Sequence, residues 1–119
     1  MSETIQLYGL KRCSTCVKAM GWLDEHKVAY HFTDYRDNPV DPGKLSQWSA
    51  EAGGWEKLIN RASMTWRNLP DGRKAPATDK EWLALAVEFP TLIKRPVMVR
   101  AGALLGLGFS DKKYSELLG

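Results

Sequence analysis

The sequence predicts an α/β fold with a mixed sheet and a helical insertion, in one domain that spans residues 1–119. Its length is within the usual size of a single domain. The apolar pattern near the N-terminus changes from strand to helix and back to strand, which is the order of a βαβ unit. Helical patterns then occupy an insert at about 41–93, and the end of the chain returns to strands and a helix.

The N-terminal βαβ unit is predicted element by element. A short apolar run around Ile5 ends at Gly9, which indicates a strand followed by a loop. From about Ser14 to His26, apolar residues recur at steps of three and four, which is typical of a helix. A second strand is predicted at Val28–Phe32, and a helix between two strands implies a right-handed crossover between parallel strands.

The helical insert follows a stretch rich in proline, aspartate and glycine, residues 35–44, which we expect to be a loop. Asp41 can cap a helix whose first position is Pro42, where the missing N–H of proline is not needed. A later helix begins at Thr78 with Glu81 three residues on, the pattern of a capping box. The five tryptophans fit a core or an interface, where large aromatic side chains are usually found.

The C-terminal part is predicted as two strands and a helix. Pro96–Arg100 and Leu104–Leu107 have the character of strands, joined by a tight turn at Ala101–Gly102. Ser110 can cap a final helix that runs to Leu118.

Composition excludes several functional classes. The net charge of +3 comes from 17 basic and 14 acidic residues that are interspersed, so we expect a solvated surface and no direct nucleic-acid binding. No apolar run approaches the roughly 18 residues of a membrane span, and no signal-peptide pattern opens the chain. We therefore expect a cytoplasmic monomer without membrane association. Thiols are reduced in that compartment, so a C-x-x-C motif indicates catalysis, redox sensing or metal binding.

The cysteine pair of YGLKRCSTC, Cys13 and Cys16, has three possible roles. With His26 and His31 it resembles a zinc-finger string, but a helix would place His26 roughly 15 Å along its axis from Cys16, beyond the ~2 Å ligand bonds of zinc. A phosphatase-like loop needs an arginine six residues after the nucleophile, where this chain has Ala19. The sequence therefore predicts a redox site and no metal.

Cys13 is predicted to be the attacking thiolate. At a helix N-terminus, unpaired backbone N–H groups and the helix dipole favour the anion and lower the pKa of a thiol. Lys11 and Arg12 add positive potential just before it, while Ser14 and Thr15 can donate hydrogen bonds to the sulfur or to a bound anion.

Cys16 lies one helical turn from Cys13, within reach for a disulfide, and is predicted to be the resolving thiol. A small buried hydrophobic residue is the alternative interpretation. Pro96 begins a predicted strand, at the place where thioredoxin-like folds often set a cis-proline opposite a reactive cysteine. We expect a cis peptide bond between Arg95 and Pro96, with a trans proline at a strand start as the alternative.

Three stretches together resemble the ArsC-type arsenate reductase family, which includes Spx and YffB-like branches. They are YGLKRCSTCVKAMGWLDEH, LINRASMTWRNLP, and LIKRPVMVR followed by LLGLGF. The resemblance covers nearly the whole chain and implies a thioredoxin-like, glutaredoxin-related fold with a helical insertion. It also implies that the cysteine that attacks arsenate in the reductases corresponds to Cys13, and that the arginine before the late proline corresponds to Arg95.

The same resemblance implies that Arg61, Arg95 and Pro96 belong to an anion- or substrate-binding site. Arg61 is one place out of register, and a third arginine expected near Phe109 is absent. Because a fixed set of guanidinium groups holds a tetrahedral oxyanion, we do not expect arsenate as the natural substrate. The predicted function is that of a glutathione-linked thiol-disulfide oxidoreductase or reductase with Cys13 as its nucleophile.

The predicted enzyme binds no resident cofactor and takes glutathione as co-substrate, with glutaredoxin or thioredoxin as partner. A C-x-x-C at this place is similar to the Spx branch, whose members are redox-switched regulators that bind RNA polymerase. The stretch GWEKLINRASMTWRNLP is instead closer to the YffB-like proteins, which are thought to be glutathione-linked thiol reductases. The alternative prediction is therefore a redox-sensing regulator in which a Cys13–Cys16 disulfide changes an interface with RNA polymerase.

Overall fold

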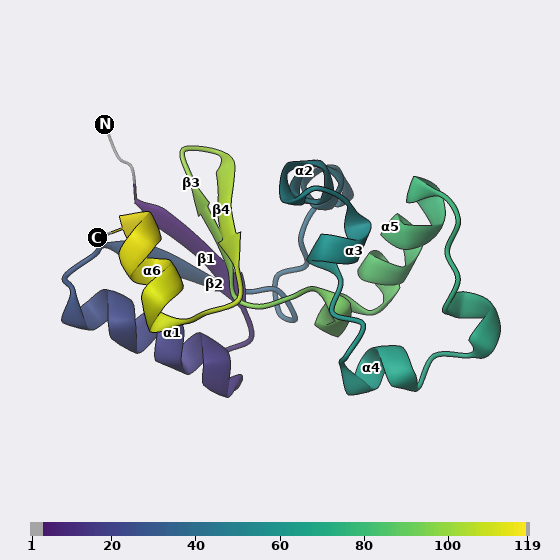
Figure 1. Ribbon diagram of the computed structural model, residues 1–119, viewed down its shortest axis with the longest axis horizontal. Coiled ribbons are helices and arrows are strands. Elements are labelled where there is room, and N and C mark those ends of the chain that lie inside the picture. The colour runs from purple at the N-terminus through teal and green to yellow at the C-terminus, as the bar shows by residue number, and fades with distance from the viewer. Residues whose placement is uncertain (1–3, 119) are drawn as a thin grey trace. The chain divides into compact units, whose positions relative to one another are not determined.

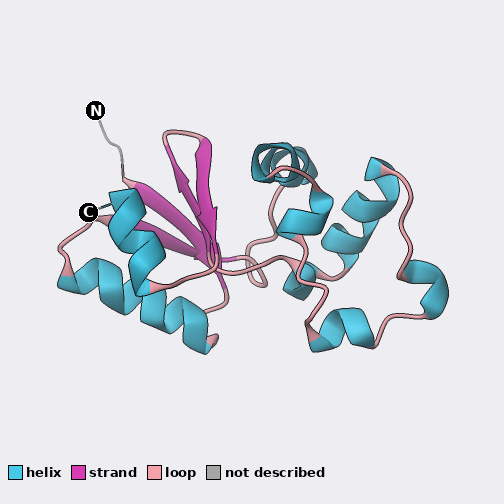
Figure 2. Ribbon diagram, in the orientation of Figure 1, coloured by secondary structure: helices cyan, strands magenta, loops and turns pink. Residues whose placement is uncertain are grey.

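A computed structural model describes residues 4–118 of the chain (Figure 1). The chain divides into two compact units. The core unit contains the residues up to Tyr35 and those from Arg95 on, and the helical unit contains Arg36–Lys94. The named strands all belong to the core unit, while the helical unit consists of helices and loops (Figure 2). The predicted α/β class is confirmed.

The core unit is built on a four-stranded mixed sheet of order β2-β1-β3-β4. The strand β1 pairs parallel with β2 and antiparallel with β3, which in turn pairs antiparallel with β4. This confirms the predicted parallel crossover and the C-terminal hairpin. The elements of the unit are β1 (Ile5–Gly9), α1 (Ser14–Glu25), β2 (Tyr30–Asp34), β3 (Val97–Arg100), β4 (Ala103–Leu107) and α6 (Asp111–Leu118).

The helices α1 and α6 pack on one face of this sheet and form an apolar cluster with it. Alternate residues of β1, Ile5 and Leu7, are buried against α1, as the twofold period of a strand requires. Tyr114 brings α6 into the same cluster, where its ring meets Trp22 edge-on at 5.5 Å between centroids. The buried members are Ile5, Leu7, Ala19, Trp22, Leu23, Met98 and Tyr114.

The second strand begins later than predicted, at Tyr30 instead of Val28. The reason is the way α1 ends. Lys27 adopts a left-handed conformation with φ 57°, and the backbone N–H of Val28 donates to the carbonyl of Leu23 at 2.9 Å. This is a Schellman-type helix end, which uses Lys27 and Val28 before pairing with β1 starts.

The C-terminal hairpin and helix follow the predicted pattern. Ala101 and Gly102 form the turn between β3 and β4, both with positive φ, at 54° and 80°. The hydroxyl of Ser110 accepts from the backbone N–H of Lys113 at 3.0 Å and caps α6. Within residues 4–118, no helix combines the length and the apolar character needed to cross a membrane.

The two longest helices of the helical unit begin at the predicted caps. Asp41 Oδ2 accepts from the N–H of Gly43 at 3.0 Å, with Pro42 as the first residue of the helix. Thr78 Oγ1 accepts from the N–H of Glu81 at 3.2 Å, as in a capping box. The elements are α2 (Pro42–Ala52), α3 (Trp55–Leu58), α4 (Met64–Arg67), α5 (Asp79–Glu88) and the short 3₁₀ helices η1 (Asp71–Arg73) and η2 (Pro90–Leu92).

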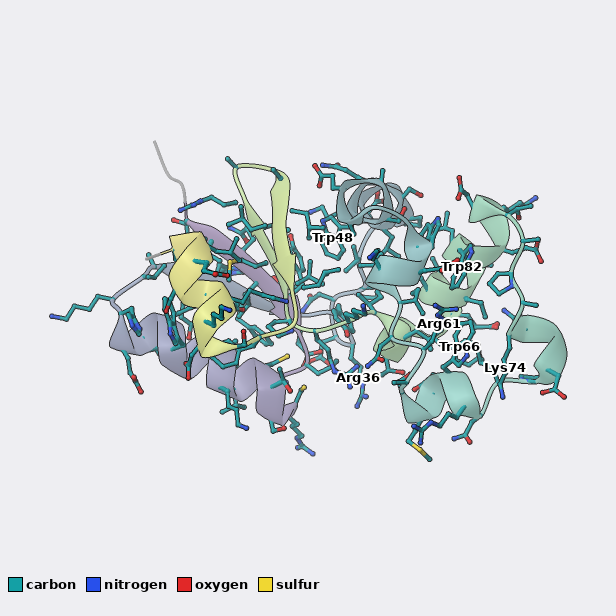
Figure 3. The ribbon with its side chains drawn as sticks, in the orientation of Figure 1. Arg36, Trp48, Arg61, Trp66, Lys74 and Trp82 are labelled. Atoms are coloured by element: carbon teal, nitrogen blue, oxygen red, sulfur yellow. The ribbon has the colours of Figure 1, made fainter. Side chains whose placement is uncertain are left out.

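The tryptophans divide between core and surface. Trp48 and Trp55 are buried in the helical unit, and Trp22 is buried in the core unit. Trp66 of α4 and Trp82 of α5 are half-buried and stack on each other, with 5.8 Å between ring centroids (Figure 3). Core packing therefore accounts for three of the five tryptophans.

Candidate active site

Cys13 occupies the N-cap position of α1, directly after the loop that follows β1. Its backbone is extended, with φ −78° and ψ 125°, and its N–H donates to the carbonyl of Leu10 at 3.0 Å to close the loop. The side chain is partly exposed and is a free thiol. The N–H groups in the first turn of a helix lack intrahelical partners, so the sulfur of Cys13 lies where an anion is favoured.

Cys16 lies one turn further along α1 and is completely buried, with 0% of its surface exposed. It packs against the end of β1, where a Cβ atom on Gly9 would come within 2.5 Å of the Cys16 sulfur. Only glycine therefore fits at that position without a shift of the sulfur. The thiols of Cys13 and Cys16 are both free and are joined by a hydrogen bond.

Arg95 supplies the positive charge that contacts Cys13. Its half-buried guanidinium hydrogen-bonds to the Cys13 sulfur and also to the side chain of Tyr35. The peptide bond between Arg95 and Pro96 is cis, as predicted, and Pro96 is buried directly before β3. The start of β3 therefore brings a cation to the N-terminus of α1.

Tyr35, directly after β2, is the fourth residue of the site, beside Cys13, Cys16 and Arg95. Its side chain has no exposed surface, and its backbone N–H donates to the carbonyl of Gly9 at 3.0 Å. Burial raises the pKa of Tyr35 to about 12, although the hydrogen bond from Arg95 works in the opposite direction. The phenol is therefore neutral at physiological pH.

The surroundings of Cys13 favour its thiolate. Burial by itself opposes ionisation, but the backbone N–H of Cys16, the Arg95 guanidinium and the Cys16 thiol together lower the pKa of Cys13 to about 7. The backbone of Thr15 contributes in the same direction. A substantial fraction of Cys13 is therefore ionised at neutral pH, as a thiol nucleophile requires.

Cys16 has the opposite tendency. Burial raises the pKa of Cys16 to about 11. The Leu10 backbone opposes this shift, and the negative charge of Cys13 adds to it. For Arg95, the hydrogen bonds to Cys13 and Tyr35 outweigh the effect of burial, so its pKa is raised. Near neutral pH the site thus combines a partly ionised Cys13 and the Arg95 guanidinium with a protonated Cys16 and a neutral Tyr35.

The remaining predicted site residues lie in two places. Lys11, Arg12 and Ser14 are exposed around Cys13, and their part in binding an anion stays a prediction. The Lys11 backbone N–H donates to Asp34 at 3.0 Å. Arg61 belongs to the helical unit, where its guanidinium lies 3.5 Å from the Glu56 carboxylate.

His26 and His31 do not lie together with the cysteines as ligands of a zinc ion would. His26 stacks on Trp22 with 3.7 Å between ring centroids, and its Nδ1 lies 2.8 Å from the Trp22 carbonyl oxygen. His31 is exposed on β2. Over residues 4–118, no three His, Cys, Asp or Glu side chains gather as a metal site would need.

Tyr35 is the site residue that the sequence analysis did not identify. It is the first residue of a stretch predicted to be a loop, and no local pattern marks a buried hydroxyl there. The parallel pairing of β1 and β2 is the signal that could have found it, because this pairing places the end of β2 beside Gly9.

Comparisons with known proteins identify the family. The model of the ArsC family matches residues 8–117, so the chain belongs to the ArsC family. The solved structure of a YFFB protein is 42% identical, with a TM-score of 0.88, and covers 98% of this chain and 100% of its own. That of an arsenate reductase (ArsC) related protein from Brucella melitensis is 34% identical, with a TM-score of 0.78, and covers 98% and 95%.

A regulator is also among the relatives. The global transcriptional regulator Spx 2 of Bacillus cereus is 29% identical over 114 residues, which is 94% of this chain and 85% of the regulator. The core unit with its C-x-x-C helix, and the inserted helical unit, therefore form the thioredoxin-like fold of ArsC proteins.

Proposed function

We propose that the protein is a thiol-disulfide oxidoreductase, linked to glutathione, in which Cys13 is the nucleophile. One observation carries the proposal: Cys13 is partly exposed at a helix N-terminus, where the backbone N–H of Cys16 and the Arg95 guanidinium lower the pKa of its thiol to about 7. A thiol of this kind reacts near neutral pH because it is ionised and yet remains a good nucleophile. Arg95 is also suited to hold a carboxylate of glutathione or another anion.

The first step is attack of the Cys13 thiolate on one sulfur of a glutathione mixed disulfide. A new sulfur–sulfur bond forms between Cys13 and glutathione, the old one breaks, and the other thiol leaves as a thiolate that takes a proton from water. The substrate is thereby reduced, and Cys13 is oxidised to a mixed disulfide.

The second step restores the thiol by one of two routes. Either a second glutathione attacks the glutathione sulfur of the adduct and leaves as oxidised glutathione, or Cys16 attacks the Cys13 sulfur and releases glutathione. The latter route yields a Cys13–Cys16 disulfide, which glutathione, glutaredoxin or thioredoxin then reduces. The hydrogen bond between the two thiols supports this route, because it brings the sulfurs close together.

The test measures reduction of the mixed disulfide of cysteine and glutathione, followed as NADPH consumption with glutathione and glutathione reductase present. We expect the wild-type protein to accelerate the reaction and Cys13→Ser to fall to the uncatalysed background. Cys16→Ser is the matched control, since it also removes a thiol from α1 but keeps Cys13.

A second arm replaces the mixed disulfide with arsenate and adds glutaredoxin, because arsenate reduction needs a set of cations that hold the oxyanion. We expect little activity in that arm. If wild type and Cys13→Ser are equally slow on both substrates, the enzyme interpretation is wrong.

A redox-sensing regulator is the second candidate, and the hydrogen-bonded cysteine pair together with the similarity to an Spx regulator favours it. In this case a Cys13–Cys16 disulfide would alter the N-terminus of α1 and with it an interface on RNA polymerase. The test is retention of purified RNA polymerase on the immobilised protein under oxidised and reduced conditions. Equal retention under both conditions, or none, eliminates this candidate.

A further inference from the structure

We propose that Tyr35 is a positioning residue that holds the Arg95 guanidinium against the Cys13 sulfur. The inference rests on the proposed role of Cys13 as nucleophile. It adds to the site a residue that lies outside both the loop that carries Cys13 and the strand that follows the cis-proline. Arg95 makes hydrogen bonds in two directions, one to the Cys13 sulfur and one to the Tyr35 side chain. The two bonds together limit where the guanidinium can lie.

The support for Tyr35 itself is rigid. Its side chain has no exposed surface, and its backbone is tied to β1 by the 3.0 Å hydrogen bond to the Gly9 carbonyl. Gly9 in turn lies against the Cys16 sulfur, so the tyrosine and the cysteine helix share one anchor point at the end of β1. A hydroxyl held in this way fixes the position of the group that donates to it.

An arginine side chain needs such a support, because it has several rotatable bonds whose freedom is lost when it is ordered. A guanidinium is also planar with donors in a fixed fork, so one N–H group can donate to the phenol oxygen while another donates to the thiolate. The titratable groups that interact with Cys13 are Arg95, Cys16 and Tyr35, and the exposed Lys11 and Arg12 precede it in the loop.

Tyr114 offers a matched control in the same core unit. It is also a buried tyrosine, with 1% of its surface exposed, but its hydroxyl makes no hydrogen bond. Tyr114→Phe therefore removes the same atom as Tyr35→Phe, without loss of a bond to Arg95. Both variants keep the ring, so that the volume of the core is unchanged.

The experiment measures the rate at which iodoacetamide alkylates Cys13 between pH 5 and 9, with mass spectrometry to separate Cys13 from Cys16. We expect Tyr35→Phe to shift the pH profile of Cys13 upward by about half a unit, which slows alkylation at pH 6 by roughly threefold. Tyr114→Phe should leave the profile unchanged. In an Arg95→Gln background, where the profile is already shifted, Tyr35→Phe should add nothing.

Two results would overturn the proposal. One is a pH profile of Cys13 alkylation that is unchanged in Tyr35→Phe, and the other is a shift of that profile by Tyr35→Phe that is equally large in the wild-type and the Arg95→Gln background. If Tyr35→Phe does not fold, Arg95→Lys tests the same point from the other side, since lysine keeps the charge but lacks the fork. We then expect an upward shift, and an unchanged profile would contradict the positioning role. The alkylation profile is independent of turnover, so failure of the proposed function leaves this test intact.

Discussion

Cys13 and Cys16 are three positions apart and have opposite chemical character. Their pKa values, about 7 and about 11, differ because one sulfur lies at the mouth of α1 beside Arg95 and the other is enclosed behind Gly9. The thiolate of Cys13 itself helps to keep Cys16 protonated. In the proposed mechanism an adduct removes the negative charge of Cys13, so that Cys16 would ionise more easily when it acts as the resolving thiol.

Tyr114→Phe is predicted to increase the stability of the protein or leave it unchanged. The buried hydroxyl of Tyr114 has no hydrogen-bond partner, so the folded state carries the desolvation penalty of that group, about 1–3 kcal/mol, without compensation. Urea unfolding followed by fluorescence measures the difference.

The comparison for Tyr114→Phe is Tyr35→Phe, which removes a hydroxyl that is hydrogen-bonded to Arg95. This second variant should lower the free energy of unfolding by about 1 kcal/mol. Equal losses in both variants would show that the hydroxyl of Tyr114 has a partner in solution.

At the level of elements, local chemistry predicted most helix and strand ends. Asp41 and Thr78 begin helices because their side chains satisfy free N–H groups, and this requirement depends only on neighbouring residues. The start of β2 was predicted two residues early, because Lys27 adopts a left-handed conformation that the apolar pattern from Val28 does not reveal.

The candidate site could be predicted only in part, because only some of its features follow from residues that are close together in the sequence. Cys13, Cys16 and the cis peptide bond at Pro96 follow from motifs that are local in sequence. The hydrogen bond between Tyr35 and Arg95 joins residues far apart in the chain. It depends on the pairing of strands, and the residues next to Tyr35 and Arg95 in the sequence carry no pattern that predicts it.

Gly9→Ala tests how tightly β1 and α1 meet. A Cβ atom at this position would lie 2.5 Å from the Cys16 sulfur, so strand or helix must shift, and we expect a loss of about 1–3 kcal/mol in the free energy of unfolding. The measurement is urea unfolding under reducing conditions.

Gly21→Ala is the control for Gly9→Ala, because Gly21 lies within α1 and a Cβ atom there meets no neighbour within 4 Å. This change should stabilise the protein by about 0.5–1 kcal/mol through helix propensity. In Gly9→Ala combined with Cys16→Ala the loss should be smaller than the sum of the single losses. Additive effects would mean that the clash with the sulfur is not the cause.

At the scale of the whole molecule, the sheet brings the site together. The central strands β1 and β3 are neighbours, and β2 lies on the other side of β1, so the ends of these strands meet near the start of α1. All four residues of the site, Cys13, Cys16, Tyr35 and Arg95, belong to the core unit. The mixed order of the sheet thus brings the side chains of the candidate site together.

The stability of the molecule is predicted to depend on pH through Cys13. The pKa of this thiol is about 7 in the folded chain and 9.0 in its ordinary state, so between these values the unfolded chain binds more protons. The free energy of unfolding of wild type, relative to Cys13→Ser, should therefore rise from pH 7 to pH 9, and the contribution is lost as pH falls below 7.

Urea unfolding in a reducing buffer at pH 6 and pH 8.5 measures this difference. The range stays below pH 9 because Cys16 has the opposite effect: its raised pKa contributes stability that is lost as pH increases toward 11. If the difference between wild type and Cys13→Ser is the same at both pH values, the thiolate is not stabilised by the fold.

Tyr35 and Arg95 are the two core residues at which the chain leaves for the helical unit and returns from it. Their hydrogen bond therefore joins the two ends of the chain segment that forms the helical unit. The entropic cost of closing such a loop increases only slowly with the number of residues in it. Insertion or deletion of residues inside the helical unit should therefore change the free energy of closing this loop only slightly. A change in the length of the helical unit is thus expected to leave the contact between the Arg95 guanidinium and the Cys13 sulfur in place.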